Sequence, residues 1–281
     1  MTGARTTYRL EDLSWPDAQA AIQAGAMAVI PVGSLEQHGR HLAINTDNVL
    51  GDAIAEAAVR EASDRGLKVL LCPPLHYGYT MHNMDFPGTM TLRAETLLAV
   101  GVDLVTSLAH HGCRRIVLLN SHGSNWSILD LIARDVMNRR PEVLVAAIFP
   151  IKMAAAELER LREAKQTGGM SHGCELETSL MLHLTDLTDM SQATAADRMT
   201  SRLRTCPVDP YGPGKKKVYL STWFLENSKH GALGDPTPAT REFGKKLFDS
   251  IVAGLTDVIE EFYAAQVAAT RRKPRRKGQR F

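Results

Sequence analysis

Short apolar runs alternate with longer amphipathic stretches along most of the chain, and this order predicts an α/β fold. Four runs have the length and composition of buried strands, at residues 26–32, 68–72, 115–119 and 143–149. Strands of this kind, separated by helical patterns, pair in parallel. We therefore expect a mostly parallel central sheet flanked by helices.

Apolar residues between these runs recur three and four positions apart, which is the spacing of one helix face. This periodicity predicts helices at 14–24, 48–62, 92–111, 127–139, 175–184 and 238–266. The charged, Ala-rich segment 152–165 is either a lid or an edge helix, and residues 186–235 are polar and broken by Pro and Gly. With no internal repeat and no linker in the pattern, we expect a single domain over residues 1–268.

The composition agrees with a globular enzyme. The chain has 281 residues, of which 44% are hydrophobic and 23% charged, which is enough for a large core and excludes a disordered or fibrous protein. The four cysteines are scattered and form no CxxC pair, so neither a disulfide framework nor a structural zinc site is expected. The sequence shows no signal-peptide pattern and no long apolar run, so we expect a cytoplasmic protein without a membrane partner.

The net charge of +2 hides an asymmetry. Residues 271–281 contain seven Lys or Arg and no acid, whereas the rest of the chain carries 26 basic and 31 acidic residues. Residues 269–281 are therefore expected to form a basic, disordered tail. Such a tail could bind nucleic acid through phosphates, but the acidic body and the lack of interleaved aromatic residues make this the weaker alternative.

Three clusters of acid–base side chains follow predicted strands, where open parallel sheets place their functional groups. The first, after the first strand, contains Glu36, His38, His41 and Asp47. The second surrounds His122 in the sequence Asn-Ser-His-Gly-Ser-Asn, directly after the third strand. The alternative for both is an ordinary polar loop or turn in solvent.

The third cluster contains His172, Glu175 and Glu177 at the start of a predicted helix. Acids suit the first turn of a helix because the dipole is positive there, which by itself explains one of the two carboxylates. Residues two apart lie about 200° around a helix, so at most one of the pair is expected to bind a metal. Carboxylates together with imidazoles fit Zn²⁺, Mn²⁺ or Fe²⁺, and two such ions bridged by one Asp are a hydrolase arrangement.

The motifs of these clusters resemble those of the creatininase (creatinine amidohydrolase) family. They occur in the family's order over residues 10–265: Glu36-Gln37-His38-Gly39, Thr46-Asp47, Phe86-Pro87-Gly88-Thr89, Asn120-x-His122-Gly123-x-Asn125, His172-Gly173, Glu177-Thr178-Ser179 and Gly234-Asp235-Pro236-Thr237. The resemblance implies an α/β fold, a two-metal site, usually a homohexamer, and hydrolysis of cyclic amides or formamides.

The resemblance also implies roles for single residues. Glu36 and His122 would hold one ion, His38 the other, and Asp47 would bridge them. Creatininase carries a Glu at the place of Ser124, whereas other members carry one at the place of Glu175, so Glu175 is expected to complete the second ion's site. His172 is expected to be catalytic as a proton carrier, with a structural role as the alternative. Glu177 is expected with it in the catalytic group, in a supporting or helix-capping role.

Departures from the family pattern bear on the substrate. Arg40 could bind a substrate carboxylate or phosphate, or be a surface or inter-subunit charge, and His82 and Ser124 are further candidates for substrate contact. Gly168 stands where creatininase has a Trp, and no Trp lies between Trp126 and Trp223, which argues against creatinine itself.

The sequence as a whole predicts a metal-dependent amidohydrolase with two divalent ions (Zn, Mn or Fe). It would cleave a C–N bond in a small cyclic amide, lactam or formamide. Peptide trimming, or a non-hydrolytic reaction at the same metal site, is the alternative.

Overall fold

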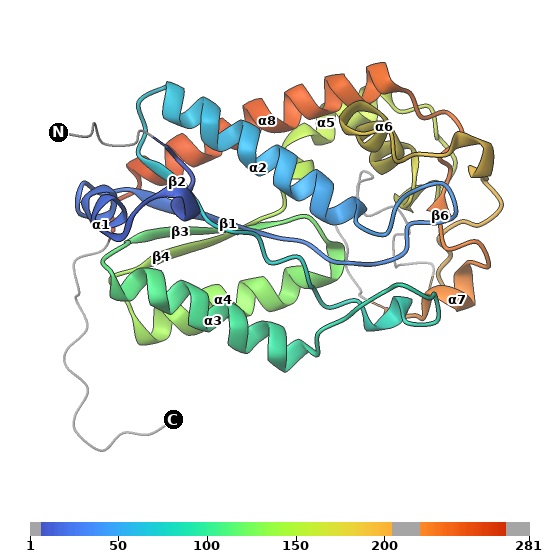
Figure 1. Ribbon diagram of the computed structural model, residues 1–281. Coiled ribbons are helices and arrows are strands. Elements are labelled where there is room, and N and C mark those ends of the chain that lie inside the picture. Colours follow the sequence, from blue (N-terminus) through green and yellow to red (C-terminus); the bar gives the residue numbers. More distant parts are fainter. Residues whose placement is uncertain (1–6, 204–219, 268–281) are drawn as a thin grey trace.

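The computed structural model describes residues 7–203 and 220–267, and its centre is a four-stranded parallel sheet (Figure 1). The strand order is β2 (Val69–Leu71), β1 (Met27–Val32), β3 (Arg115–Asn120) and β4 (Leu144–Ile148). All three pairings are parallel. The expected α/β fold with a parallel central sheet is confirmed, and each strand lies within one of the four predicted apolar runs or one residue beyond it.

Helices cover both faces of the sheet, and short 3-10 turns occupy several connections. The α-helices are α1 (Trp15–Gln23), α2 (Thr46–Asp64), α3 (Ala94–His110), α4 (Trp126–Arg139), α5 (Ala155–Leu161), α6 (Glu175–Leu184), α7 (Phe224–Asn227) and α8 (Arg241–Ala264). The 3-10 turns are η1 (Leu10–Asp12), η2 (Met81–Asn83), η3 (Gly123–Asn125), η4 (Pro150–Ala154) and η5 (Met190–Gln192).

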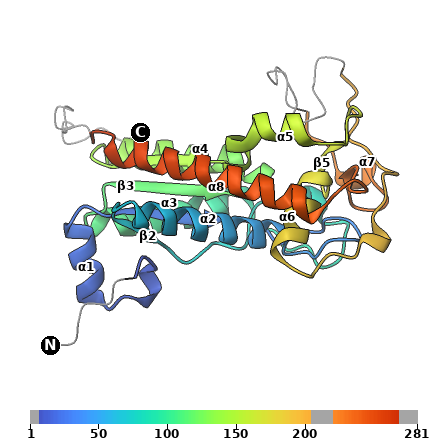
Figure 2. The same cartoon turned by 90° about the horizontal axis from the view of Figure 1, so that it is seen from above.

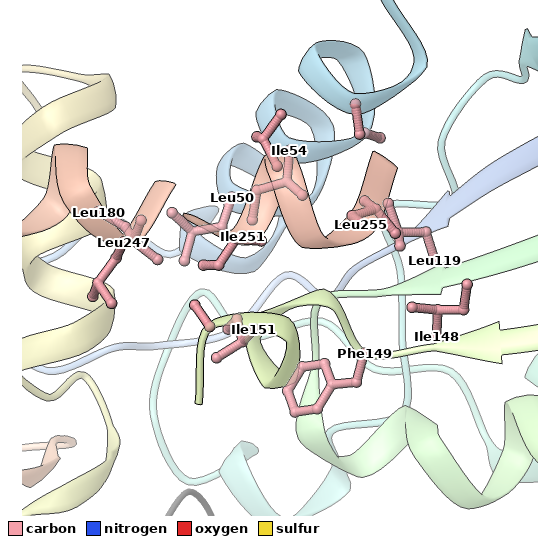
Figure 3. Packing of buried hydrophobic residues seen from close by; sticks show 14 of the residues in the cluster. Leu50, Ile54, Leu119, Ile148, Phe149, Ile151, Leu180, Leu247, Ile251 and Leu255 are labelled. Carbon is pink, nitrogen blue, oxygen red and sulfur yellow. The ribbon is translucent and has the colours of Figure 1, made fainter. Parts of the chain in front are cut away.

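The two faces of the sheet have separate cores because successive strand residues point to opposite sides. Met27 and Val29 of β1 pack with α2, α6 and α8, whereas Ala28 and Ile30 pack with α3 and α4. Figure 1 shows this layering, and Figure 2 shows α2 and α8 side by side over the sheet. Figure 3 shows the first core, in which α8 contributes Leu247, Ile251 and Leu255.

The segment between β4 and α6 contains two short helices, η4 and α5. Leu158 of α5 is buried in the same core as α8. This contact identifies the segment as an edge helix, which was one of the two alternatives for residues 152–165.

A second, two-stranded antiparallel sheet pairs β5 (Met170–His172) with β6 (Leu233–Gly234). The apolar pattern did not predict either strand, because they are only three and two residues long. β5 ends at His172 and so fixes the position of this residue.

The described elements form a single α/β domain. The expected domain boundary at 268 and the basic tail 269–281 lie outside the described residues. None of the described helices is both long and apolar enough to cross a bilayer.

Candidate metal centre

Six buried acid–base side chains meet at the carboxyl ends of β1 and β3. They come from five places in the chain, namely the loop after β1, the start of α2, the turn after β3, the end of β5 and the first turn of α6. The six residues are Glu36, His38, Asp47, His122, His172 and Glu177. The sequence clusters expected at strand ends are therefore brought together, as the sheet topology predicts.

Asp47 lies at the middle of this group. One of its carboxylate oxygens is 3.2 Å from Nε2 of His38, and the other is 3.0 Å from Nδ1 of His122. The same His122 nitrogen is 3.1 Å from Oε1 of Glu36. On the other side, Nε2 of His38 is 4.0 Å from Oε2 of Glu177. Asp47 thus lies between two groups of side chains, His122 with Glu36 on one side and His38 with Glu177 on the other.

Three sets of three residues have ligand atoms within 4.8 Å of one another. One set is Glu36, Asp47 and His122, and a second is His38, Asp47 and Glu177. The third combines Glu36 and His38 with His172, whose ring stacks on that of His38 at a centroid distance of 4.1 Å. The first two sets share Asp47, whose carboxylate therefore lies between them.

Each of the three histidines donates one ring N–H to a backbone carbonyl. Nδ1 of His38 lies 3.1 Å from the Glu36 carbonyl, Nε2 of His122 lies 3.1 Å from the Tyr79 carbonyl, and Nε2 of His172 lies 2.6 Å from the Gln37 carbonyl. A carbonyl oxygen can only accept, so the proton is on these nitrogens. The second nitrogen of each ring faces the carboxylates, and once deprotonated it would offer a lone pair to an ion there, an orientation typical of metal-binding histidines.

The donor set itself fits a divalent cation. Nε2 of His38 and Oδ2 of Asp47 are buried without a partner of good hydrogen-bond geometry, and the polar atoms next to them belong to the cluster itself. Among the described residues, no Lys or Arg side chain pairs with the carboxylates of Glu36, Asp47 or Glu177. Buried negative charge needs such compensation, and oxygen and imidazole ligands suit Zn²⁺, Mn²⁺ and Fe²⁺.

The pKa values of these groups show how strongly they interact. Burial opposes the charge on His38, but Asp47, Glu177 and Glu36 together raise its pKa to about 9. Burial raises the pKa of Glu177 to about 7, and burial with the nearby charge of His38 lowers the pKa of His172 to about 3. Without a cation, the raised pKa values favour the protonated forms of His38 and Glu177, whereas the lowered pKa of His172 keeps its imidazole neutral.

The structure places Glu177, and not Glu175, in the cluster. Glu175 does not reach the cluster, because its carboxylate accepts hydrogen bonds from the backbone N–H groups of Glu163 and Ala164 at 2.8–3.0 Å. Glu177 lies in the cluster, and its Oε2 also accepts from the N–H of Gly173 at 2.6 Å. The expectation that Glu175 faces the metals was wrong, although only one of the pair does face them.

The remaining predicted residues lie around the centre. His41 is buried but bonds to Oγ1 of Thr178 at 2.9 Å, away from the three ligand sets. Arg40 is exposed on the loop. His82 and Ser124 are half-buried and 3.4 Å apart, and the His82 ring is 6.3 Å from that of His122. These two residues therefore lie beside the cluster, and their contact with a substrate stays a prediction.

Residues outside the predicted set support the cluster. Thr80 and Asn83 both donate to Oε2 of Glu36. The side-chain amide of Gln37 donates to Asn83 and to the Gly231 carbonyl. The aromatic ring of Phe224 lies against His172 at a centroid distance of 4.6 Å. Nothing in the local spacing pointed to Thr80 or Phe224, because they reach the site from segments far from the three clusters, just before η2 and at the start of α7.

A buried set of carboxylates and imidazoles at the carboxyl ends of a parallel sheet is the arrangement of a metal-dependent hydrolase. The comparisons with known proteins agree. The family model described as creatinine amidohydrolase matches residues 11–259, so the chain belongs to the creatininase family. The matched region contains all six residues of the cluster.

The relatives include two kinds of hydrolase that act on C–N bonds. The chain is 29% identical to a creatinine amidohydrolase of Pseudomonas putida over 265 residues, covering 89% of this chain and 95% of the relative. It is 30% identical to a mycofactocin precursor peptide peptidase of Mycolicibacterium smegmatis, covering 84% and 85% of the two chains. The expected class, a hydrolase of C–N bonds, is thereby confirmed.

Solved structures agree with the fold. A creatininase structure named for Mn superposes with a TM-score of 0.75 at 28% identity, covering 92% of this chain and 100% of that one. A mutant creatininase described as Zn–Zn type gives the same values. Two of these structures are thus described with metal ions, and the donor set here is a candidate metal-binding group.

Proposed function

We propose that this protein hydrolyses a C–N bond in a small cyclic amide, lactam or formamide at a centre of two divalent ions. The observation that carries the proposal is the position of Asp47, whose two oxygens face His38 and His122 separately. Glu36 and His122 would hold one ion with Asp47, and His38 and Glu177 the other. Zn, Mn and Fe all suit these ligands.

Two bound ions would lower the pKa of a water molecule and polarise the substrate carbonyl. The protein's own part in the reaction concerns the proton. His172 donates from Nε2 to the Gln37 carbonyl, so its Nδ1, 3.6 Å from Oε1 of Glu36, is the nitrogen that faces the centre. As the water oxygen adds to the carbonyl carbon and the C–N bond breaks, Nδ1 can carry the water proton to the leaving nitrogen.

Peptide trimming is a second candidate, because the chain is as similar to peptidases as to an amidohydrolase. The burial of the whole ligand set favours a small substrate. The two candidates differ in the products they release, and a non-hydrolytic reaction differs from both because hydrolysis adds one water to the product mass.

The test uses Asp47→Asn in the metal-loaded protein. Metal content is measured by mass spectrometry, and turnover is measured on creatinine, a lactam series, N-formyl amines and short peptides. We expect the variant to lose at least one ion per chain and more than 99% of its turnover. The control is Asp52→Asn on the same helix, where the carboxylate is half-exposed and pairs with His76 at 2.7 Å. Retained metal and turnover in Asp47→Asn would overturn the proposal.

We further propose a homohexamer in the cytoplasm, as the family resemblance implies. A small molecule would be its substrate partner, and neither nucleic acid nor a membrane is expected to bind. Analytical ultracentrifugation of the full chain tests the assembly.

A further inference from the structure

The ring of Phe224 lies beside two imidazoles at the centre, those of His172 and His82. It lies edge-on to His172, with centroids 4.6 Å apart and an interplanar angle of 72°. It is also 5.4 Å from the ring of His82. The three rings therefore line one continuous wall beside the metal ligands, with Phe224 as its apolar part.

Hydrogen bonds fix α7, which carries Phe224, relative to the site. The Phe224 carbonyl accepts from the N–H of Ser228 at 2.9 Å, and the buried Ser228 hydroxyl donates to Asp197 at 2.8 Å. Three residues further on, the Gly231 carbonyl accepts from the side chain of Gln37. Gln37 in turn holds His172 through its backbone carbonyl. The position of Phe224 is thus coupled to that of the catalytic histidine.

Phe224 also differs from its neighbours in the direction of its side chain. Trp223 and Leu225 are 46% and 53% exposed, whereas Phe224 is half-buried against the two histidines. A phenyl ring offers neither a donor nor an acceptor, so this part of the wall does not compensate the burial of an anionic or strongly hydrated group. A flat, uncharged surface packs on it well.

We propose that Phe224 is a specificity-determining residue of the proposed hydrolase. It forms the apolar wall of the substrate site and selects amides that present a flat, uncharged ring or acyl face next to the scissile C–N bond. The neighbouring pair His82–Ser124, 3.4 Å apart, supplies the polar contact at the edge of that wall. The inference rests on the proposed metal centre.

Two hydroxamates distinguish the contribution of the Phe224 wall to binding from the contribution of the metal centre. Acetohydroxamate and benzohydroxamate bind metal through the same group, but only the second carries a flat ring. Calorimetry on the zinc-loaded full chain is expected to show about 10-fold tighter binding of benzohydroxamate, which corresponds to about 1.4 kcal/mol. In Phe224→Ala this preference is expected to fall below about threefold, with acetohydroxamate affinity and zinc content unchanged.

The control variant is Leu225→Ala, which removes a more exposed side chain from the same turn and is expected to keep the preference. Phe224→Leu is a second, more conservative variant that tests the inference if Phe224→Ala misfolds. It is expected to show an intermediate preference with an unchanged melting temperature. A preference that survives in Phe224→Ala, while both ligands still bind, would overturn the inference alone. Failure of both hydroxamates to bind the zinc-loaded wild type would overturn the metal centre and this inference together.

Discussion

At the scale of single residues, the roles of Glu175 and Glu177 depend on a difference of two positions in one helix. Their carboxylates leave α6 in different directions, so Glu177 meets His38 while Glu175 meets the chain before β5. Both are buried, and burial raises the pKa of both. What distinguishes them is the partner, which is an imidazole in one case and two backbone N–H groups in the other.

The first prediction follows from this difference. Glu177→Gln is expected to remove one of the two ions and most of the turnover, because an amide is a much weaker metal ligand than a carboxylate. Glu175→Gln is expected to keep both ions but to lower the free energy of unfolding by about 1–3 kcal/mol, because it weakens a buried, charge-assisted pair of hydrogen bonds. Metal analysis and urea denaturation measure the two effects, and loss of metal in Glu175→Gln would restore the original assignment.

A second prediction concerns His41, which is buried but bonds to Thr178 outside the ligand sets. Burial, with a smaller effect of His38, lowers the pKa of His41 from 6.5 to about 4. Because the folded pKa is the lower one, the unfolded chain binds more protons between these values, and stability is lost as the pH falls. The loss should approach about 1.4 kcal/mol per pH unit below pH 6.5.

The measurement compares wild type with His41→Gln, both metal-free, by urea denaturation from pH 8 to pH 4.5. The free energy of unfolding of the wild type minus that of His41→Gln should be constant above pH 7. This difference should decrease as the pH falls below 6.5. A difference that stays constant over the whole range contradicts the expectation.

At the scale of elements, apolar periodicity located α2, α3, α4, α6 and α8 to within a few residues, because each buries one continuous stripe. It did not reveal how closely α6 and α8 approach each other. A Cβ atom at Gly244 would lie only 1.8 Å from the carbonyl oxygen of Ser179. Glycine at this position lets α8 pack directly on the backbone of the helix that carries Glu177.

The third prediction concerns this contact. In most helices, Gly to Ala stabilises by about 1 kcal/mol through helix propensity. Gly244→Ala is expected to do the opposite and to lower the free energy of unfolding by more than about 2 kcal/mol, because the methyl group forces the two backbones apart. Thermal denaturation of Gly244→Ala measures the effect. Ala253→Gly, at an exposed position of α8, is the control and should cost only about 1 kcal/mol.

At the scale of the whole molecule, the sheet order β2-β1-β3-β4 puts the carboxyl ends of β1 and β3 next to each other. Residues from five chain segments then surround one buried volume, and three carboxylates enter it without a Lys or Arg partner from the described part of the chain. Folding this site without cations therefore carries an electrostatic cost.

The fourth prediction is that metal removal destabilises the whole domain. At a free metal concentration 100-fold above Kd, binding stabilises the folded state by about 2.7 kcal/mol. Chelation with dipicolinate should lower the melting temperature by about 5–10 °C for a chain of this size. Asp47→Asn should respond much less to the chelator. Equal melting temperatures of the wild type with and without chelator would contradict the expectation.

The sequence by itself determined the class of fold, the strands and the long helices, and its resemblance to the family singled out Glu36, His38, Asp47 and His122 as proposed ligands. Local pattern explains the fold and the general place of these side chains, since polar residues directly after a buried parallel strand lie at its carboxyl end. Only the tertiary structure decided that Glu177 and not Glu175 faces the centre, and that Phe224 lies against His172. Those placements depend on how the start of α6 is oriented and on where a distant loop returns to the sheet. Because contacts between segments far apart in the chain fix both, no local pattern could contain them.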